Sequence, residues 1–177
     1  SQKFGYGLEA AGFHATFYHH VGALLGVLIG GRLADRYAVR SRLSRPLIQV
    51  LGLLGGAPFI YLMAHAEAPR VVFLALGLFG VFRGLYDSNL FASLFEVVRP
   101  EARATATGLM IAGAFLVGGT ASVVTGAISE RIGLGPALAL TSLGYALGGA
   151  LLALDCLLWF RRDAARMQAG FAAAGAR

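Results

Sequence analysis

Five apolar segments, each about as long as a bilayer-spanning helix, constrain this chain more than any other feature of its sequence. A transmembrane helix needs about 20 predominantly apolar residues, and 57% of the chain is hydrophobic while only 14% is charged. Soluble domains carry about 25% charged residues. The sequence therefore predicts an all-α integral membrane domain over residues 13–160, with spans at 13–34, 46–65, 70–98, 104–129 and 134–160.

The positive charges are distributed unevenly between the two ends of these spans. Residues 1–12 are expected to be an external loop remnant and residues 161–177 a cytoplasmic tail. Because cytoplasmic loops carry an excess of Lys and Arg, the distribution predicts a multi-pass protein of the cell inner (plasma) membrane with a cytoplasmic C-terminus. Eleven arginines fall on that side against Lys3, Arg70 and Arg131 on the other, and the eleven are Arg32, Arg36, Arg40, Arg42, Arg45, Arg99, Arg103, Arg161, Arg162, Arg166 and Arg177.

The net charge of +6 does not indicate nucleic-acid binding, because the basic residues lie at the ends of apolar segments rather than on a polar surface. The expected surroundings are instead a lipid bilayer. A single cysteine, Cys156, and the spacing of the four histidines give no metal-site pattern. We expect no metal and no cofactor. We also expect no enzyme, because Asp87 has no second carboxylate or nucleophile beside it.

Glycines mark two of the spans as helix-packing surfaces. Gly22, Gly26 and Gly30 recur at every fourth residue and lie on one side of the first span. Small residues let two helix backbones approach closely in a membrane, so a neighbouring helix is expected against this side. The span 104–129 is also rich in glycine and is expected to have contact faces of the same kind.

The run Gly31-Arg32-Leu33-Ala34-Asp35-Arg36-Tyr37-Ala38-Val39-Arg40 resembles the signature loop of the major facilitator superfamily, with Ala38 in place of a glycine and Val39 in place of a basic residue. Such a weakened copy follows the eighth helix in that family. The run Pro100-Glu101-Ala102-Arg103 resembles the turn between helices ten and eleven. The resemblance implies helices eight to twelve, which are the C-terminal six-helix bundle without its first helix, and a transporter whose N-terminal half is missing from this chain. Within the family, the sequence FRGLYDSNLFASLFEVV of the third span is most similar to members that move organic anions or sugar acids.

The resemblance implies that the loop acts as a conformational latch, which stabilises one of the two access states of a transporter. Its residues would be Gly31, Asp35, Arg36 and Arg40. An anion such as Asp35 is favoured near a helix N-terminus by about 0.3–1 kcal/mol. The alternative is that these arginines only anchor the helix end at the cytoplasmic surface.

The third span carries the candidate substrate-binding residues Arg83, Tyr86, Asp87 and Asn89. Helical spacing places Phe82, Tyr86, Asn89 and Ser93 on one face, and places Arg83 next to Asp87 as an i,i+4 pair. A charge at mid-membrane costs at least about 2.5 kcal/mol, so both charges are expected to face protein or a water-filled cavity. Either they form part of a cavity wall, with Arg83 attracting an anion, or they are a buried pair that only pins the helix.

His19 is the fifth candidate substrate-binding residue. It lies three residues before Gly22, and a histidine, which as a residue type titrates near neutral pH, suits a proton-coupled carrier. The alternative is an ordinary interfacial histidine, as for His14 and His20.

Together these features predict the C-terminal portion of a secondary active transporter, operating as a symporter, that moves a small polar solute by alternating access. The expected small-molecule substrate is an organic anion or a sugar-like compound. The alternative is a membrane receptor or assembly partner that does not transport. Near the cytoplasmic end of the third span, Glu96 is expected to pair with Arg99.

Overall fold

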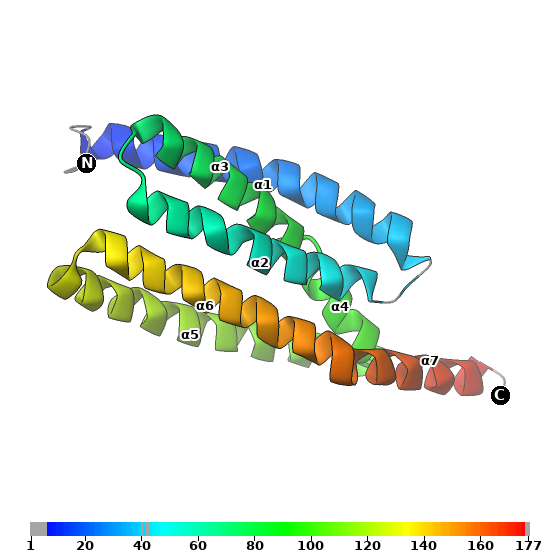
Figure 1. The fold of residues 1–177 in the computed structure, drawn as a ribbon. Coiled ribbons are helices and arrows are strands. Elements are labelled where there is room, and N and C mark those ends of the chain that lie inside the picture. Colours follow the sequence, from blue (N-terminus) through cyan, green and yellow to red (C-terminus); the bar gives the residue numbers. More distant parts are fainter. Residues whose placement is uncertain (1–6, 40, 42, 176–177) are drawn as a thin grey trace.

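The structure is a computed structural model that describes residues 7–39, 41 and 43–175, and within them it contains helices and no strand. The helices are α1 (Leu8–Ala38), α2 (Ser44–His65), α3 (Pro69–Asp87), α4 (Leu90–Val97), the 3-10 turn η1 (Pro100–Ala102), α5 (Arg103–Ile132), α6 (Leu134–Asp155), the π-helical segment η2 (Cys156–Phe160) and α7 (Arg161–Gly175). The long helices lie side by side, and α6 continues through η2 into α7 (Figure 1). The expectation of an all-α membrane fold is confirmed.

Four helical stretches are long and apolar enough to cross a membrane. They are Ser44–His65, Pro69–Val97, Pro100–Ile132 and Leu134–Met167, with mean hydropathies of 1.5 to 1.8. The fifth long helix, α1, has 31 residues and three histidines in its first half, which lower its mean hydropathy. In lipid every backbone N–H and C=O must be satisfied within the protein, which is why each of these segments is helical.

Two of the expected segments differ from the helices observed. The helix α1 begins at Leu8, inside the segment 1–12 that was expected to be a loop. The segment 161–177, expected to be a tail that is helical at first, is helical as far as Gly175. The expected span 70–98 is two helices, because a turn at Ser88 and Asn89 separates α3 from α4. The helix α5 ends where Gly133 takes a φ of +90°, which suits glycine and reverses the chain into α6.

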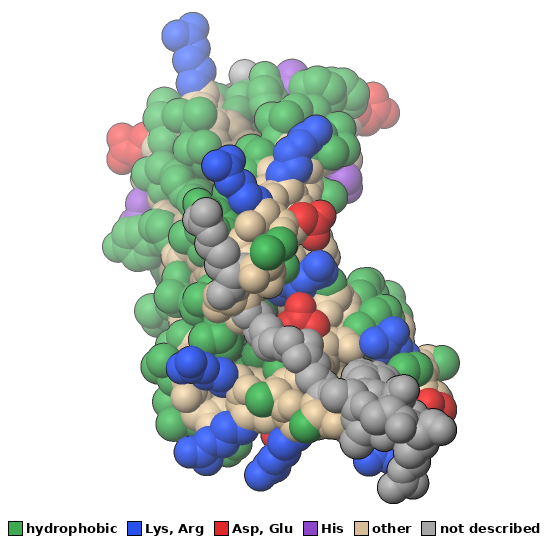
Figure 2. Space-filling view, turned by 90° about the vertical axis from the view of Figure 1, so that its right-hand side faces the viewer, with side chains coloured by type: hydrophobic (Ala, Val, Ile, Leu, Met, Phe, Trp, Pro, Cys, Tyr) green, Lys and Arg blue, Asp and Glu red, His purple; other side chains and the backbone are tan. Residues whose placement is uncertain are grey.

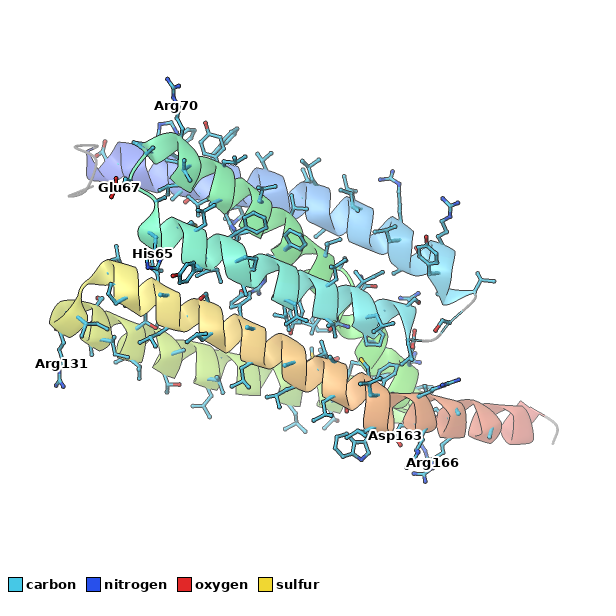
Figure 3. The ribbon with its side chains drawn as sticks, viewed as in Figure 1. His65, Glu67, Arg70, Arg131, Asp163 and Arg166 are labelled. Carbon is cyan, nitrogen blue, oxygen red and sulfur yellow. The ribbon has the colours of Figure 1, made fainter. Side chains whose placement is uncertain are left out.

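The two ends of the bundle differ in charge. The labelled residues His65, Glu67, Arg70 and Arg131 lie at one end, whereas Asp163 and Arg166 of α7 lie at the other (Figure 3). Figure 2 faces the end from which α7 projects, where arginine side chains are spread over the surface among a few acidic ones. This is the end to which the sequence assigns most of the arginines.

The helices α1 and α3 pack backbone to backbone. A Cβ atom added to Gly22 would collide with the Gly77 carbonyl, and one added to Gly26 would collide with the Val81 carbonyl. In the other direction, Gly80 and Gly84 of α3 lie against the backbone of α1. The expectation that the glycine side of α1 receives a neighbouring helix is confirmed, and that neighbour is α3.

The helix α5 is packed very differently. It lies along α6 (Figure 1), and none of its described residues is buried. Its glycines, Gly108, Gly113, Gly118, Gly119 and Gly126, all face open space, with no atom within 4 Å of an added Cβ. The glycine-rich contact faces expected on this span therefore have no partner within the described part of the chain.

Candidate functional site

Arg83 and Asp87 form an ion pair at the midpoint of the Pro69–Val97 segment. The Nε atom of Arg83 donates to both carboxylate oxygens of Asp87, at 3.0 and 2.9 Å. The side chains are 42% and 40% exposed. Arg83 also donates from Nη1 to the hydroxyl of Tyr145 on α6, at 3.0 Å. The i,i+4 pairing expected from the sequence is confirmed, and a third member joins it from the last long helix.

Aromatic rings surround this pair. The guanidinium of Arg83 lies 5.7 Å from the ring centroid of Tyr86. One turn before Arg83, the ring of Phe79 stacks on His19 of α1 at 5.4 Å and meets Tyr145 edge-on, also at 5.4 Å. Three helices therefore contribute to one cluster, which we call the Arg83 cluster and define as His19, Phe79, Arg83, Tyr86, Asp87 and Tyr145.

Asn89 lies in a different environment from the other candidate residues. It is 1% exposed, and its Nδ2 donates to Ser88 Oγ at 2.9 Å, to the Leu85 carbonyl at 3.3 Å and to the Gly30 carbonyl at 3.5 Å. It therefore ties the α3–α4 turn to α1. A solute could reach the Asn89 side chain only after this turn rearranges.

Gln49 of α2 holds the same turn from the other side. It is 4% exposed, and its Nε2 donates to the Asn89 carbonyl at 3.2 Å and to Ser93 Oγ at 2.5 Å. Further along α3, Phe82 and Tyr86 lie against Gly55 and Gly52 of α2. On the face expected from helical spacing, Phe82 and Tyr86 lie against α2 and Ser93 is bonded to Gln49, whereas the Asn89 side chain is bonded to α1.

The loop candidates lie around Arg45, near the start of α2. Arg45 donates from Nη2 to Asp35 at 3.3 Å, and its Nε lies 3.2 Å from a Glu96 carboxylate oxygen. Glu96 thus pairs with Arg45, whereas the sequence analysis expected Arg99, because the α3–α4 break directs the end of α4 towards α2. We call Asp35, Arg45 and Glu96 the loop triad.

The other loop candidates contribute less to this triad. Arg36 is exposed, and a Cβ atom added to Gly31 would meet no atom within 4 Å. Arg40 lies outside the described residues.

Arg103 connects the turn after α4 to the C-terminal end of that helix. It follows the 3-10 turn Pro100–Ala102 and donates from Nη2 to the Phe95 carbonyl at 3.1 Å, with its guanidinium 5.1 Å from the Phe95 ring. Cations favour the C-terminal end of a helix, so Arg103 closes the end of α4.

Sequence reasoning missed Tyr145, Gln49 and Arg45 as partners. Gln49 is the one amide side chain in the segment 46–65, and a polar side chain in an apolar span is a signal that could have found it. Tyr145 and Arg45 carry no comparable signal, because their roles depend on which helices become neighbours. Across the described residues, no group of three or more His, Cys, Asp or Glu side chains is placed to hold a metal ion.

Comparison with known proteins gives concordant results. The family model described as Major Facilitator Superfamily matches residues 1–175. Protein spinster homolog 1 of Xenopus tropicalis is 34% identical over 134 residues, which cover 72% of this chain and 26% of that protein. The 3-(3-hydroxy-phenyl)propionate transporter of Escherichia coli K12 is 34% identical over 139 residues, which cover 78% of this chain and 28% of that protein. The chain thus spans about a quarter of the length of these relatives.

Proposed function

Because this chain belongs to the major facilitator superfamily, we propose that it forms the C-terminal portion of a secondary active transporter that moves a small organic anion or sugar-like solute by alternating access. Such carriers bind their solute near the bilayer midplane, between two bundles that rock against each other. The similar protein from Escherichia coli is named as a transporter of an organic acid, which favours the anion over the sugar.

The observation that carries this proposal is the half-exposed ion pair at the middle of the third span. An arginine at mid-membrane is costly unless it faces protein or water, and a purely structural pair would be better buried. The side chains of Arg83 and Asp87 are 42% and 40% exposed. Arg83 thus attracts the anionic group, while Asp87 balances its charge or carries the coupled proton.

The neighbouring candidates have distinct roles in this proposal. Tyr86 and His19 flank the anion, and His19 offers a second proton acceptor. Asn89 contacts the solute only in a state in which the α3–α4 turn has rearranged, because it is buried among backbone carbonyls here. Arg83 remains the primary contact in both states.

Transport by the full-length protein in liposomes tests the role of Arg83. We expect Arg83→Ala to abolish saturable organic-anion uptake and Arg83→Lys to raise KM, because Lys keeps the charge but lacks the planar fork that binds a carboxylate with two hydrogen bonds. The matched control is Arg131→Ala, which removes an arginine at the end of the bundle, far from the ion pair. Normal uptake by both Arg83 variants would reduce the pair to a scaffold.

We propose that the loop triad, together with the loop residues Gly31, Arg36 and Arg40, is the latch that stabilises one access state. Asp35 and Glu96 share Arg45, so motion of α4 away from α2 would separate charges. In the full-length protein, Asp35→Asn should shift the balance between outward- and inward-open states, measured by cysteine accessibility on both sides. An unchanged balance with unchanged transport would leave the loop as a simple anchor.

The missing N-terminal half of the transporter is the proposed partner of α5, whose glycine-rich faces are uncovered. The same proposal places the protein in the cell inner membrane with the arginine-rich end of the bundle and the C-terminus in the cytoplasm. Reporter fusions at Gly133 and after α7 test this orientation, and a reporter that is active outside the cell after α7 would reverse it.

A further inference from the structure

The C-terminal end of the last long helix carries a surface that is separate from the Arg83 cluster. We propose that an anionic phospholipid binds where η2 passes into α7. Its phosphate lies at Arg161 and Arg162, and its acyl chains lie along the exposed side of α6. This lipid site is independent of the transported solute and of the direction in which the protein is inserted.

The continuous helix formed by α6, η2 and α7 turns one side towards the bundle. Cys156, Phe160 and Ala164 recur at every fourth residue on this side and are buried, and α7 contacts α4. Two residues along a helix correspond to about half a turn. Leu158 and Arg162 therefore lie on the side that faces away from the bundle.

That outward side is a row of leucines that leads into arginines. Leu151, Leu154 and Leu158 are 58%, 46% and 45% exposed and follow one another at helical spacings of four and three residues. Arg162 and Arg166 continue the row at intervals of four residues, and both are exposed. Apolar and then basic residues on one side of a helix match the order of acyl chains and phosphate in one leaflet of a bilayer.

The length of the helix places the first arginines at the level of the lipid phosphates. The stretch Leu134–Phe160 contains no Lys or Arg and one acid, Asp155. At 1.5 Å per residue it is about 40 Å long, whereas the hydrocarbon core of a bilayer is about 30 Å thick. Trp159 is 54% exposed, and tryptophan is enriched at the boundary of that core. Arg161 and Arg162 follow directly, in the headgroup region.

These two arginines have unused hydrogen-bond donors. Within the described residues, the only acid of α7 is Asp163, and it pairs with Arg166 at 3.7 Å. Asp163 and Arg166 project from α7 away from the bundle (Figure 3). The described part of the chain offers no ion pair to Arg161 or Arg162. A guanidinium binds a phosphate through two parallel hydrogen bonds, so both side chains are suited to a phosphodiester.

The leucines decide between a lipid and a soluble phosphate. A free phosphate would contact the two arginines alone and would leave the exposed leucines beside them in the same surroundings as before. A phospholipid covers both kinds of residue at once. Each basic residue near an anionic membrane surface strengthens the association by about fivefold.

Quenching of Trp159 by brominated lipids tests the site in the full-length protein. Nanodiscs contain mixtures of phosphatidylcholine and phosphatidylglycerol, with bromine on the acyl chains of one lipid or of the other. The difference in fluorescence between the unmodified protein and Trp159→Phe isolates the signal of Trp159, the one tryptophan of this chain. We expect phosphatidylglycerol to associate with Trp159 about 5- to 30-fold more strongly than phosphatidylcholine, the range for one or two arginines.

Variants assign this preference to the arginines. The double variant Arg161→Gln with Arg162→Gln should bring the ratio of the two lipids close to one. The matched control is Arg131→Gln, an exposed arginine at the other end of the bundle (Figure 3), and its ratio should equal that of the unmodified protein. If the double variant does not fold, the unmodified protein is compared at about 0.05 M and about 0.5 M salt, because salt screens exposed charges and should lower the ratio.

The remaining outcomes would overturn the lipid site. Equal quenching by the two lipids would remove the preference for an anionic headgroup, and a preference that persists in the double variant would remove the role of the arginines. Absence of quenching by either lipid would show that protein covers this side of α6. Loss of the preference on addition of inorganic phosphate would assign the arginines to a soluble anion. Solute uptake enters none of these measurements, so failure of the proposed transport function would leave them unchanged.

Discussion

The helices α1 and α5 both carry glycines at intervals suited to close packing, yet they have opposite environments. Gly22 and Gly26 of α1 lie against the backbone of α3, where an added Cβ atom would collide with a carbonyl. The glycines of α5 meet nothing within 4 Å. Close packing requires small residues on both helices in matching register, and α3 supplies them for α1 through Gly77, Gly80 and Gly84. Within the described residues, no helix supplies them for α5.

The strongest test of this difference replaces one glycine on each helix by the branched residue valine. Gly26→Val should cost at least about 3 kcal/mol of unfolding free energy, because its Cβ would collide with the Val81 carbonyl and backbone cannot move aside cheaply. Thermal unfolding of this chain in detergent measures the loss.

Gly118→Val on α5 is the matched control for Gly26→Val. It adds the same atoms where the structure has open space. Equal losses in the two variants would contradict the packing difference between α1 and α5.

The second prediction concerns the polar contacts that accompany the tight packing. Gln49→Leu should cost about 1–3 kcal/mol, because the Asn89 carbonyl and the Ser93 hydroxyl would lose their buried donor. Chemical unfolding of the chain in detergent, followed by far-UV circular dichroism, measures the loss. Gln49→Glu should cost at least as much as Gln49→Leu, since it buries a charge. A neutral Gln49→Leu would mean that the α3–α4 turn needs no tie to α2.

These contacts show which parts of the structure the sequence alone predicts and which parts it does not. The helical class, the packing side of α1 and the Arg83–Asp87 pair follow from local spacing, and local spacing is visible in a single chain. The break after Asp87 does not follow, because Ser88 and Asn89 are compatible with a helix and the contacts that hold the turn come from Gln49 and Gly30, 40 and 59 residues away. Pairings such as Arg45 with Glu96, and Arg83 with Tyr145, depend on helix neighbours that periodicity does not specify.

A smaller effect is expected for the loop triad. Arg45→Gln should change the unfolding free energy of the chain by no more than about 1 kcal/mol, because exposed ion pairs contribute little and Asp35 is 76% exposed. The same variant should still disturb the balance of access states in the full-length protein. A large stability loss in detergent would show that the triad supports the fold rather than the transport cycle.

The smallest expected effect is that of an alanine on the uncovered face of α5. Gly118→Ala should leave the chain unchanged or stabilise it by up to about 1 kcal/mol, because alanine has the higher helix propensity and meets no atom. If the N-terminal half covers α5, the same change should destabilise the full-length protein. Differential scanning fluorimetry of both forms compares the two, and an identical shift in each would mean that nothing packs on α5 at Gly118.

The interleaved backbones of α1 and α3 have a consequence for motion. The carbonyls of each helix occupy the space in which the other helix would otherwise have side chains. The two helices therefore cannot slide past each other without steric overlap, and they move as one rigid unit. His19 and Arg83 are attached to the two members of that unit. Spin labels on α1 and α3 should therefore keep a constant separation in every state of the full-length protein.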